Sequence, residues 1–211
     1  MKVCEIFSSI QGESTYAGMP CVFVRMTGCN LRCSYCDTVY AYEEGTELTG
    51  EEIMDKIQAI GLKTVEITGG EPLLQKDVPP LAKKLLDREY RVLIETNGSQ
   101  DIHGIDERAV IILDIKTPGS GMADKVMLSN LPLLKPQDEV KFVITHRNDY
   151  EWAKIFVREH SLMGRCTILF SPAFGMLDPR HLSKWILEDR LEVRLNLQLH
   201  KYIYGPDVRG V

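Results

Sequence analysis

Short apolar, β-branched runs alternate along this chain with longer stretches whose apolar residues recur at helical spacing. Neighbouring parallel strands need a long connection, usually a helix, so this alternation favours parallel strands joined by crossover helices. The sequence therefore predicts an α/β fold. The runs that predict strands are residues 21–26, 64–68, 91–96, 110–116, 139–145, 167–170 and 192–199.

Two of the helical stretches have recognisable beginnings. Thr49 and Glu52 have the spacing of a capping box, in which each side chain accepts a hydrogen bond from the other residue's backbone N–H. A later helix is expected to begin at Asn148. The apolar stripe expected on that helix consists of Trp152, Ile155 and Phe156.

The chain has 211 residues, whereas a complete eightfold β/α barrel typically has roughly 250. No repeat, low-complexity tract or linker divides the sequence. We therefore expect a single domain, residues 1–211, folded as a partial TIM-type β/α barrel that is truncated and open. In such folds the active site lies at the carboxyl ends of the strands.

Polar residues follow the predicted strands at the points where they end. One such cluster is weak evidence, because strand ends are polar in most proteins, but the agreement of seven indicates a site at one rim of the barrel. The clusters are the loop after residue 26 and residues 68–72, 95–98, 114–116, 145–146, 171–172 and 198–201.

The charge balance limits the classes of partner. A net charge of −5, with no run of lysine or arginine, argues against nucleic-acid binding as the main task. The first residues lack the long apolar stretch of a signal peptide, and no later segment has the length and hydropathy of a membrane span. We expect a cytoplasmic protein with no membrane partner.

Cys29, Cys33 and Cys36 lie within eight residues of one another. A structural zinc site needs four ligands and disulfides need pairs, so three thiolates complete neither. Three thiolates suit a [4Fe-4S] cluster that leaves one iron open to a ligand from outside the protein. The remaining cysteines are expected to be small buried apolar residues: Cys4, Cys21 and Cys166.

The C-x3-C-x2-C spacing resembles the signature of radical S-adenosylmethionine enzymes, in which that cofactor fills the open iron position. Gly69 to Pro72 could be a simple turn, but it looks like the family's motif for the methionyl amino group. Tyr35 lies where the family usually has an aromatic residue near the adenine. The resemblance implies S-adenosylmethionine contacts by Tyr35, Gly69, Gly70, Glu71, Lys116 and Ser171.

A narrower resemblance covers essentially the whole chain. Residues 6–15, 22–25, 36–38 and 200–203 resemble 7-carboxy-7-deazaguanine synthases. This implies ring contraction of 6-carboxy-5,6,7,8-tetrahydropterin to 7-carboxy-7-deazaguanine, with loss of ammonia, on the route to queuosine and other deazapurines. It also implies Mg²⁺, a flavodoxin- or ferredoxin-type electron donor, regeneration of S-adenosylmethionine and a homodimer.

The resemblance also suggests how the substrate is held. Arg25 can bind the pterin carboxylate through two parallel hydrogen bonds, although it could equally form a strand-edge ion pair. Thr38 is implied to be the one protein ligand of Mg²⁺, a cation that commonly takes few protein ligands. No side chain is assigned as catalytic, because the radical forms on the cofactor. The substrate residues are Ile10, Gln11, Gly12, Glu13, Arg25, Thr68 and His200.

Three alternatives remain at this stage. A glycyl-radical enzyme activating protein shares the cysteine spacing, but residues 11–13 and the tail 200–203 favour the synthase. A zinc-binding module lacks a fourth ligand. In the tail, Gln198 and His200 are expected to share one face of a strand, whereas the alternative is a core-facing row of Leu195, Leu197 and Leu199.

Overall fold

The computed structural model describes all residues, 1–211, and contains one nine-stranded sheet in the order β3-β1-β2-β4-β5-β6-β7-β8-β9. Strand β1 runs antiparallel to β2 and β3, and all pairs from β2 to β9 are parallel. The strands are β1 (Lys2–Ile10), β2 (Pro20–Met26), β3 (Thr46–Glu47), β4 (Thr64–Gly69), β5 (Arg91–Thr96), β6 (Val110–Ile115), β7 (Glu139–Ile144), β8 (Thr167–Pro172) and β9 (Arg194–Leu195).

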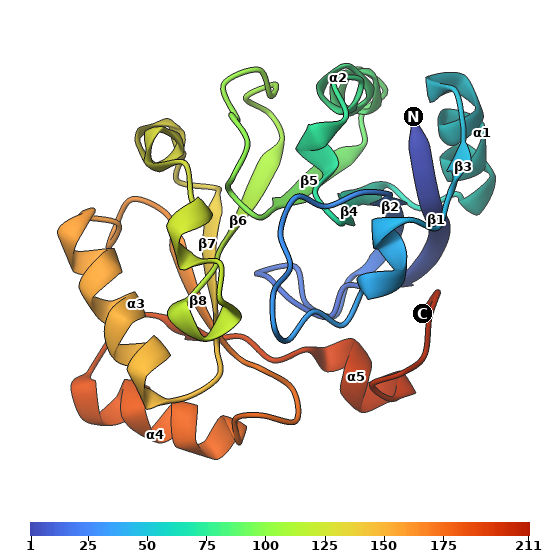
Figure 1. Ribbon diagram of the computed structural model, residues 1–211. Coiled ribbons are helices and arrows are strands. Elements are labelled where there is room, and N and C mark those ends of the chain that lie inside the picture. The colour runs from blue at the N-terminus through green and yellow to red at the C-terminus, as the bar shows by residue number, and fades with distance from the viewer.

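The helices lie around this sheet. Figure 1 shows α1 to α4 outside the curved sheet and α5 near the C-terminus on its open side. The α-helices are α1 (Gly50–Ile60), α2 (Val78–Asp87), α3 (Arg147–Glu159), α4 (Pro179–Asp189) and α5 (Leu199–Tyr204). Short 3₁₀ helices are η1 (Val39–Tyr42), η2 (Pro72–Leu74), η3 (Pro118–Ser120), η4 (Ala123–Lys125) and η5 (Leu128–Leu133).

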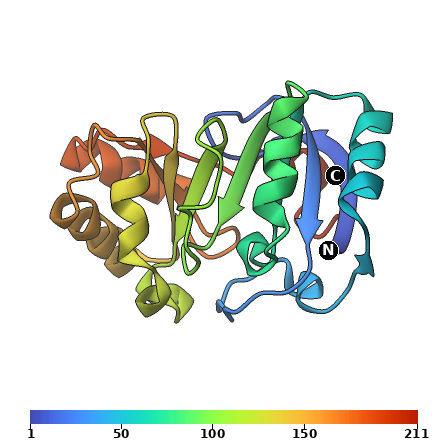
Figure 2. The same cartoon turned by 90° about the horizontal axis from the view of Figure 1, so that it is seen from above.

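The sheet curves but does not close, because β3 and β9 are its two edges and do not pair with each other. The prediction of an open, partial β/α barrel is confirmed. The parallel strands β2 and β5 point the same way in Figure 2, and the loops that follow them gather at the lower edge of that view. No helix has the length and hydropathy needed to cross a membrane.

One face of the parallel strands forms the core with the outer helices. Val65 and Ile67 of β4 pack in the same cluster as Ile53 and Ile57 of α1. On the other half of the sheet, Phe142 of β7 belongs to a second cluster that α3 and α4 cover. Since side chains alternate between the two faces of a strand, the residues between these apolar ones point into the barrel.

The predicted helix beginnings are close to those observed. Thr49 caps α1, and its capping box with Glu52 is confirmed. Helix α3 begins at Arg147, one residue before the predicted start, and the His146 side chain accepts a hydrogen bond from the Asp149 backbone N–H. The predicted stripe on α3 is wrong for Ile155, which is 44% exposed. The buried residues of α3 are Asp149, Tyr150, Ala153, Phe156 and Val157.

The last predicted strand is wrong in most of its length. Only Arg194–Leu195 pairs with β8, and Gln198 is the N-cap of α5, so the strand alternation expected for Gln198 and His200 does not apply. The alternative leucine row also fails, because Leu195 and Leu197 are 38% and 37% exposed. The prediction also lacked β1, the antiparallel strand that lies next to β2.

Candidate active site

A cavity of about 500 Å³ opens among the inner face of the sheet, the loops at the carboxyl ends of its strands and α5. This size is within the range of small-molecule sites. Most residues expected at the site line this cavity. They are Ile10, Gln11, Glu13, Arg25, Cys29, Cys33, Tyr35, Cys36, Thr38, Thr68, Gly69, Gly70, Lys116 and His200.

The cysteine loop follows β2 and carries three unpaired thiols into the cavity. Its conformation is fixed from both sides: Leu31 is 2% exposed, and the backbone and hydroxyl of Ser34 donate hydrogen bonds of 3.0 and 2.7 Å to Ser120 O and Gly119 O. Burial raises the pKa of the Cys29 and Cys33 thiols. Three free sulfur donors on one anchored loop fit the requirements of a [4Fe-4S] cluster with one open iron.

The other three cysteines lie outside the cavity lining. Cys21 is fully buried, as expected, and burial raises the pKa of its thiol. Cys4 and Cys166 are only partly buried, so the expectation of fully buried cysteines is wrong for these two. Neither contacts the cysteine loop through any hydrogen bond.

The Gly69–Gly70 turn is explained by packing as well as by access to a ligand. A Cβ atom at Gly69, whose φ is +127°, would lie 2.3 Å from the Met26 carbonyl oxygen. A Cβ atom at Gly70 would lie 2.0 Å from the carbonyl oxygen of Gly28. The end of β4 can therefore pack against the start of the cysteine loop only because Gly69 and Gly70 have no side chains. Both glycines still line the cavity.

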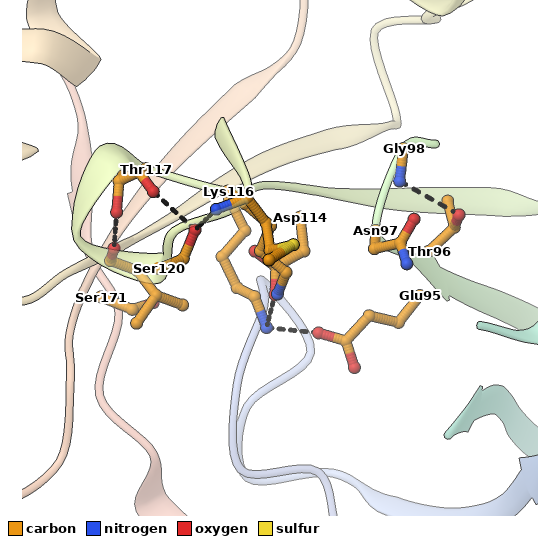
Figure 3. Close-up of polar contacts among 12 residues, drawn as sticks. Glu95, Thr96, Asn97, Gly98, Asp114, Lys116, Thr117, Ser120 and Ser171 are labelled. Carbon is orange, nitrogen blue, oxygen red and sulfur yellow. Dashed lines mark hydrogen bonds and ion pairs between the residues drawn. The ribbon is translucent and has the colours of Figure 1, made fainter. Parts of the chain in front are cut away.

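Glu71 does not line the cavity, contrary to the expectation of a ligand contact. Its carboxylate is fully buried and accepts hydrogen bonds from Leu73 N (3.0 Å), Thr96 Oγ1 (2.8 Å) and Asn97 N (2.7 Å). Gly98 N in turn contacts Thr96 Oγ1 at 3.3 Å (Figure 3). The structure thus gives Glu71 a structural task, which is to fix the turn after β5 against the end of β4.

Two other expected site residues also lie behind the cavity wall. Ser171 is 2% exposed, and its Oγ accepts a 2.8 Å hydrogen bond from Asn196 Nδ2. Gly12 contacts α5: a Cβ atom there would lie 2.0 Å from His200 Nδ1 and 2.9 Å from the His200 backbone nitrogen. Direct ligand contact by either residue is therefore not supported, and Gly12 instead sets how closely α5 approaches.

Charged side chains from the inner face of the sheet meet in the cavity wall. Lys141 of β7 is 4% exposed, and its Nζ lies 3.0 Å from Glu13 Oε2, 3.3 Å from Asp114 Oδ2 and in contact with Glu95. Lys116 Nζ lies 2.9 Å from Asp114 Oδ2. Figure 3 shows Glu95 of β5 and Asp114 of β6 directed toward this region from neighbouring strands. One oxygen of Asp114 remains buried without a partner.

Glu66 of β4 is a carboxyl group of a different kind. It is 3% exposed, lines the cavity and contacts the Gln11 amide through one oxygen. Burial, together with the nearby Glu95 carboxylate, raises the pKa of Glu66 well above its ordinary value, which favours the protonated form. Sequence reasoning missed Glu66 and Lys141, although charged residues at alternate positions of apolar strands are a readable signal.

Two groups at the cavity wall have hydrogen-bonding capacity to spare. The Tyr35 hydroxyl is buried with no hydrogen-bond partner, and Lys116 Nζ lies 6.0 Å from the centre of the Tyr35 ring. Arg25 pairs through Nε with Glu5 at 2.7 Å, which realises the ion pair considered as the alternative. Its two Nη groups make no hydrogen bond within the chain, so the ion pair does not exclude a carboxylate ligand.

The C-terminal helix α5 completes the cavity wall. Gln198 Nε2 donates to Glu13 Oε1 at 3.0 Å, and Lys201 forms an ion pair with Asp37, which follows the last cysteine of the loop. Burial lowers the pKa of His200, which favours its neutral form. Burial acts to raise the pKa of Asp37, but the Lys201 ammonium outweighs burial and lowers this pKa to about 2. The tail therefore contacts both the β1–β2 loop and the cysteine loop.

Comparison with known proteins agrees with this arrangement. Residues 23–118 match the Radical SAM superfamily. A 7-carboxy-7-deazaguanine synthase from Chlorobaculum tepidum is 49% identical, covering 100% of this chain and 97% of that protein. One from Koribacter versatilis is 44% identical over 100% of both chains. The crystal structure of QueE from Escherichia coli has the same fold, with a TM-score of 0.79, 22% identity and 94% of each chain covered.

Proposed function

The chain belongs to the 7-carboxy-7-deazaguanine synthase family, and we propose from this that it converts 6-carboxy-5,6,7,8-tetrahydropterin to 7-carboxy-7-deazaguanine with release of ammonia. It is a radical S-adenosylmethionine enzyme, whose family uses a [4Fe-4S] cluster and S-adenosylmethionine. One observation carries the proposal for this chain: three free cysteines, the glycine turn and Arg25 line one cavity of about 500 Å³. Carbon–nitrogen bond cleavage makes the reaction a lyase reaction.

We assign the cluster to Cys29, Cys33 and Cys36, and S-adenosylmethionine to the adjacent wall. With both bound, the cofactors supply one-electron radical chemistry. Gly69 and Gly70 leave the backbone bare beside the cysteine loop. The unpartnered Tyr35 hydroxyl and the nearby Lys116 can hold polar groups of the cofactor.

The opposite wall suits a flat anion rich in hydrogen-bonding groups. Arg25 has two Nη groups free to bind a carboxylate. Glu13, Gln11 and Glu66 present acceptors and donors that can pair with a pterin edge, and a wrong ligand would leave these buried groups unpaired. Loss of ammonia requires a proton on the departing nitrogen, and Glu66 and Lys141 are proton-bearing groups of the cavity wall.

The proposed reaction can be tested with the reconstituted protein under anaerobic conditions. Incubation with 6-carboxy-5,6,7,8-tetrahydropterin, S-adenosylmethionine, Mg²⁺ and a reductant should yield 7-carboxy-7-deazaguanine and ammonia in equal amounts. Omission of S-adenosylmethionine should abolish both products. Absence of the deazapurine from the complete mixture would refute the proposal, and formation of a glycyl radical on an added protein would favour an activating enzyme.

We propose that Mg²⁺ binds at Thr38, with substrate oxygens and water as its other ligands. Thr38 lines the cavity, and its hydroxyl oxygen lies at the end of the cysteine loop. Thr38→Ala should leave the visible absorption of the cluster unchanged while raising the Mg²⁺ concentration for half-maximal activity by about tenfold or more. A Mg²⁺ titration that matches the unsubstituted enzyme would make Thr38 a simple turn residue.

A second prediction concerns Gly12. Gly12→Ala would place a methyl group 2.9 Å from the His200 backbone nitrogen, so α5 must move away from the cavity. Overpacking of this kind costs ~1–3 kcal/mol, and we expect the KM for the pterin to rise by about tenfold or more while S-adenosylmethionine binding changes little. Gly104→Ala is the matched control, because no atom lies within 4 Å of a Cβ there. Equal KM values for the pterin in Gly12→Ala and Gly104→Ala would contradict the prediction.

Further proposals rest on the family to which the chain belongs. We propose that residues 1–211 act as one domain, that a flavodoxin- or ferredoxin-type protein supplies electrons, and that the enzyme is a cytoplasmic homodimer that binds no nucleic acid. The six free cysteines are compatible with a reducing compartment. The single sheet, which includes strands from both ends of the chain, supports the one-domain proposal.

A further inference from the structure

Lys201, Asp37 and Thr38 form a line of contacts from the C-terminal helix to the end of the cysteine loop. Lys201 Nζ lies 2.5 Å from Asp37 Oδ2. The other carboxylate oxygen, Asp37 Oδ1, accepts a 2.8 Å hydrogen bond from the Thr38 hydroxyl. One oxygen of Asp37 is therefore paired with the Lys201 ammonium, and the other accepts the hydrogen bond that the Thr38 hydroxyl donates.

Lys201 is held in place by more than this ion pair. It is 9% exposed, its Nζ lies 5.5 Å from the centre of the Phe174 ring, and Asp37 is its one ion-pair partner. Helix α5 itself is fixed by a 2.8 Å hydrogen bond from Leu199 N to Gly12 O. Asp37 is about half exposed, with 48% of its side chain accessible, so without Lys201 it could adopt other rotamers.

A threonine hydroxyl binds a cation through an oxygen lone pair, so its proton must point to another acceptor. Groups that hydrogen-bond to a metal ligand commonly set its orientation. We propose that Lys201 is a positioning residue for Thr38: it fixes Asp37, which holds the Thr38 proton and leaves the hydroxyl lone pairs free for a divalent cation. This inference rests on the proposed Mg²⁺ site at Thr38.

The arrangement links the cation site to closure of the cavity. Asp37 and Lys201 are 164 residues apart in the sequence, and the lysine reaches the loop only when α5 is docked. The cation therefore meets a correctly oriented hydroxyl only after the tail covers the cavity. Binding of the cation and ordering of the tail should favour each other.

Mn²⁺ can replace Mg²⁺ as a spectroscopic probe of binding. The reconstituted protein, with an oxidised cluster, the pterin substrate and no reductant, is titrated with Mn²⁺, and free Mn²⁺ is measured by electron paramagnetic resonance. Lys201→Met should raise the Mn²⁺ dissociation constant by about tenfold. Lys201→Arg, which keeps the ion pair, should restore most of the affinity. Lys154→Met, which removes a lysine–aspartate pair between α3 and α4, is the control and should change nothing.

A double-substitution cycle tests whether Lys201 acts through Thr38. In a Thr38→Ala background, Lys201→Met should cause no further loss of Mn²⁺ affinity. Equal dissociation constants for Lys201→Met and Lys154→Met, or losses that multiply in the double variant, would overturn the inference. An unchanged constant for Thr38→Ala would overturn the cation site itself. If Lys201→Met does not fold, Asp37→Ala is expected to give the same non-additive result and replaces it in the cycle.

Discussion

Replacing any one of Cys29, Cys33 and Cys36 by alanine is expected to abolish the cluster and all synthase activity. The three thiols line one cavity on a single anchored loop, and no other cysteine lines that cavity to substitute for a lost ligand. With two thiolates the cluster has two open irons and is exposed to solvent and oxidant. Bound iron, acid-labile sulfide and the broad visible absorption should all be lost after anaerobic reconstitution.

Cys166→Ala is the matched control. Cys166 is partly buried, packs at the edge of the core that α3 and α4 cover, and lies outside the cavity lining. Its replacement should leave iron, sulfide and activity at the level of the unsubstituted protein. Full cluster content in one of the three loop variants, or complete loss in Cys166→Ala with the fold intact, would contradict the assignment.

The positions of the parallel strands along the chain could be predicted because their apolar residues are local signals. Five of the predicted runs agree with β2, β4, β5, β6 and β7 to within one residue at each end. Each has a buried outer face, and a β-branched run bounded by polar residues identifies it. The polar clusters after β2, β4, β5 and β6 contribute residues to the cavity, since parallel strands bring their carboxyl ends together, whereas residues 145–146 and 171–172 do not line it.

The tail could not be predicted in the same way. Residues 192–199 alternate leucine with polar residues, which is the pattern of a half-buried strand. The strand nevertheless ends after Leu195, and Lys201 in the following helix is nearly buried because it pairs with Asp37. A contact between residues 164 positions apart has no local signal. The role of Glu71 also has no local signal. Its motif predicts a contact with S-adenosylmethionine, but its carboxylate accepts hydrogen bonds from the turn after β5.

The interior charges show a second limit of sequence reasoning. Glu95 and Asp114 lie near predicted strand ends, whereas Lys141 and Glu66 lie within predicted strands, at positions where no site residue is expected. Alternation alone says that these side chains share the inner face. Which carboxylate keeps its charge depends on distances to Lys141 and on burial, and both exist only in the folded chain.

Lys141→Met is expected to destabilise the fold strongly. The lysine ammonium is the shared partner of Glu13, Glu95 and Asp114, and methionine has a similar length but no charge. Removing one partner of a buried charge group costs ~3–5 kcal/mol, because Glu13 and Glu95 lose their ion-pair partner and Asp114 keeps only Lys116. The midpoint of urea unfolding, measured anaerobically on the reconstituted protein, should fall accordingly. Lys83→Met, which breaks an exposed pair with Asp87, is the control and should leave the midpoint nearly unchanged.

The effect of Lys141→Met should also depend on pH, and the direction follows from the charges. Asp114, Glu13 and Glu95 raise the pKa of Lys141 well above its ordinary value, although burial acts in the opposite direction. The contribution of Lys141 to the free energy of unfolding is therefore fully present below the lysine pKa of the unfolded chain, and it is constant between pH 5.5 and 8. Without the ammonium, the pKa values of Glu13 and Asp114, which it helps to lower against burial, must rise in the folded state. The folded variant then binds more protons than the folded unsubstituted protein, so its stability relative to that protein falls as pH rises. The loss relative to the unsubstituted protein should therefore be larger at pH 8 than at pH 5.5. Equal losses at both values would contradict this prediction, because they would show that no carboxyl group gains a proton when the ammonium is removed.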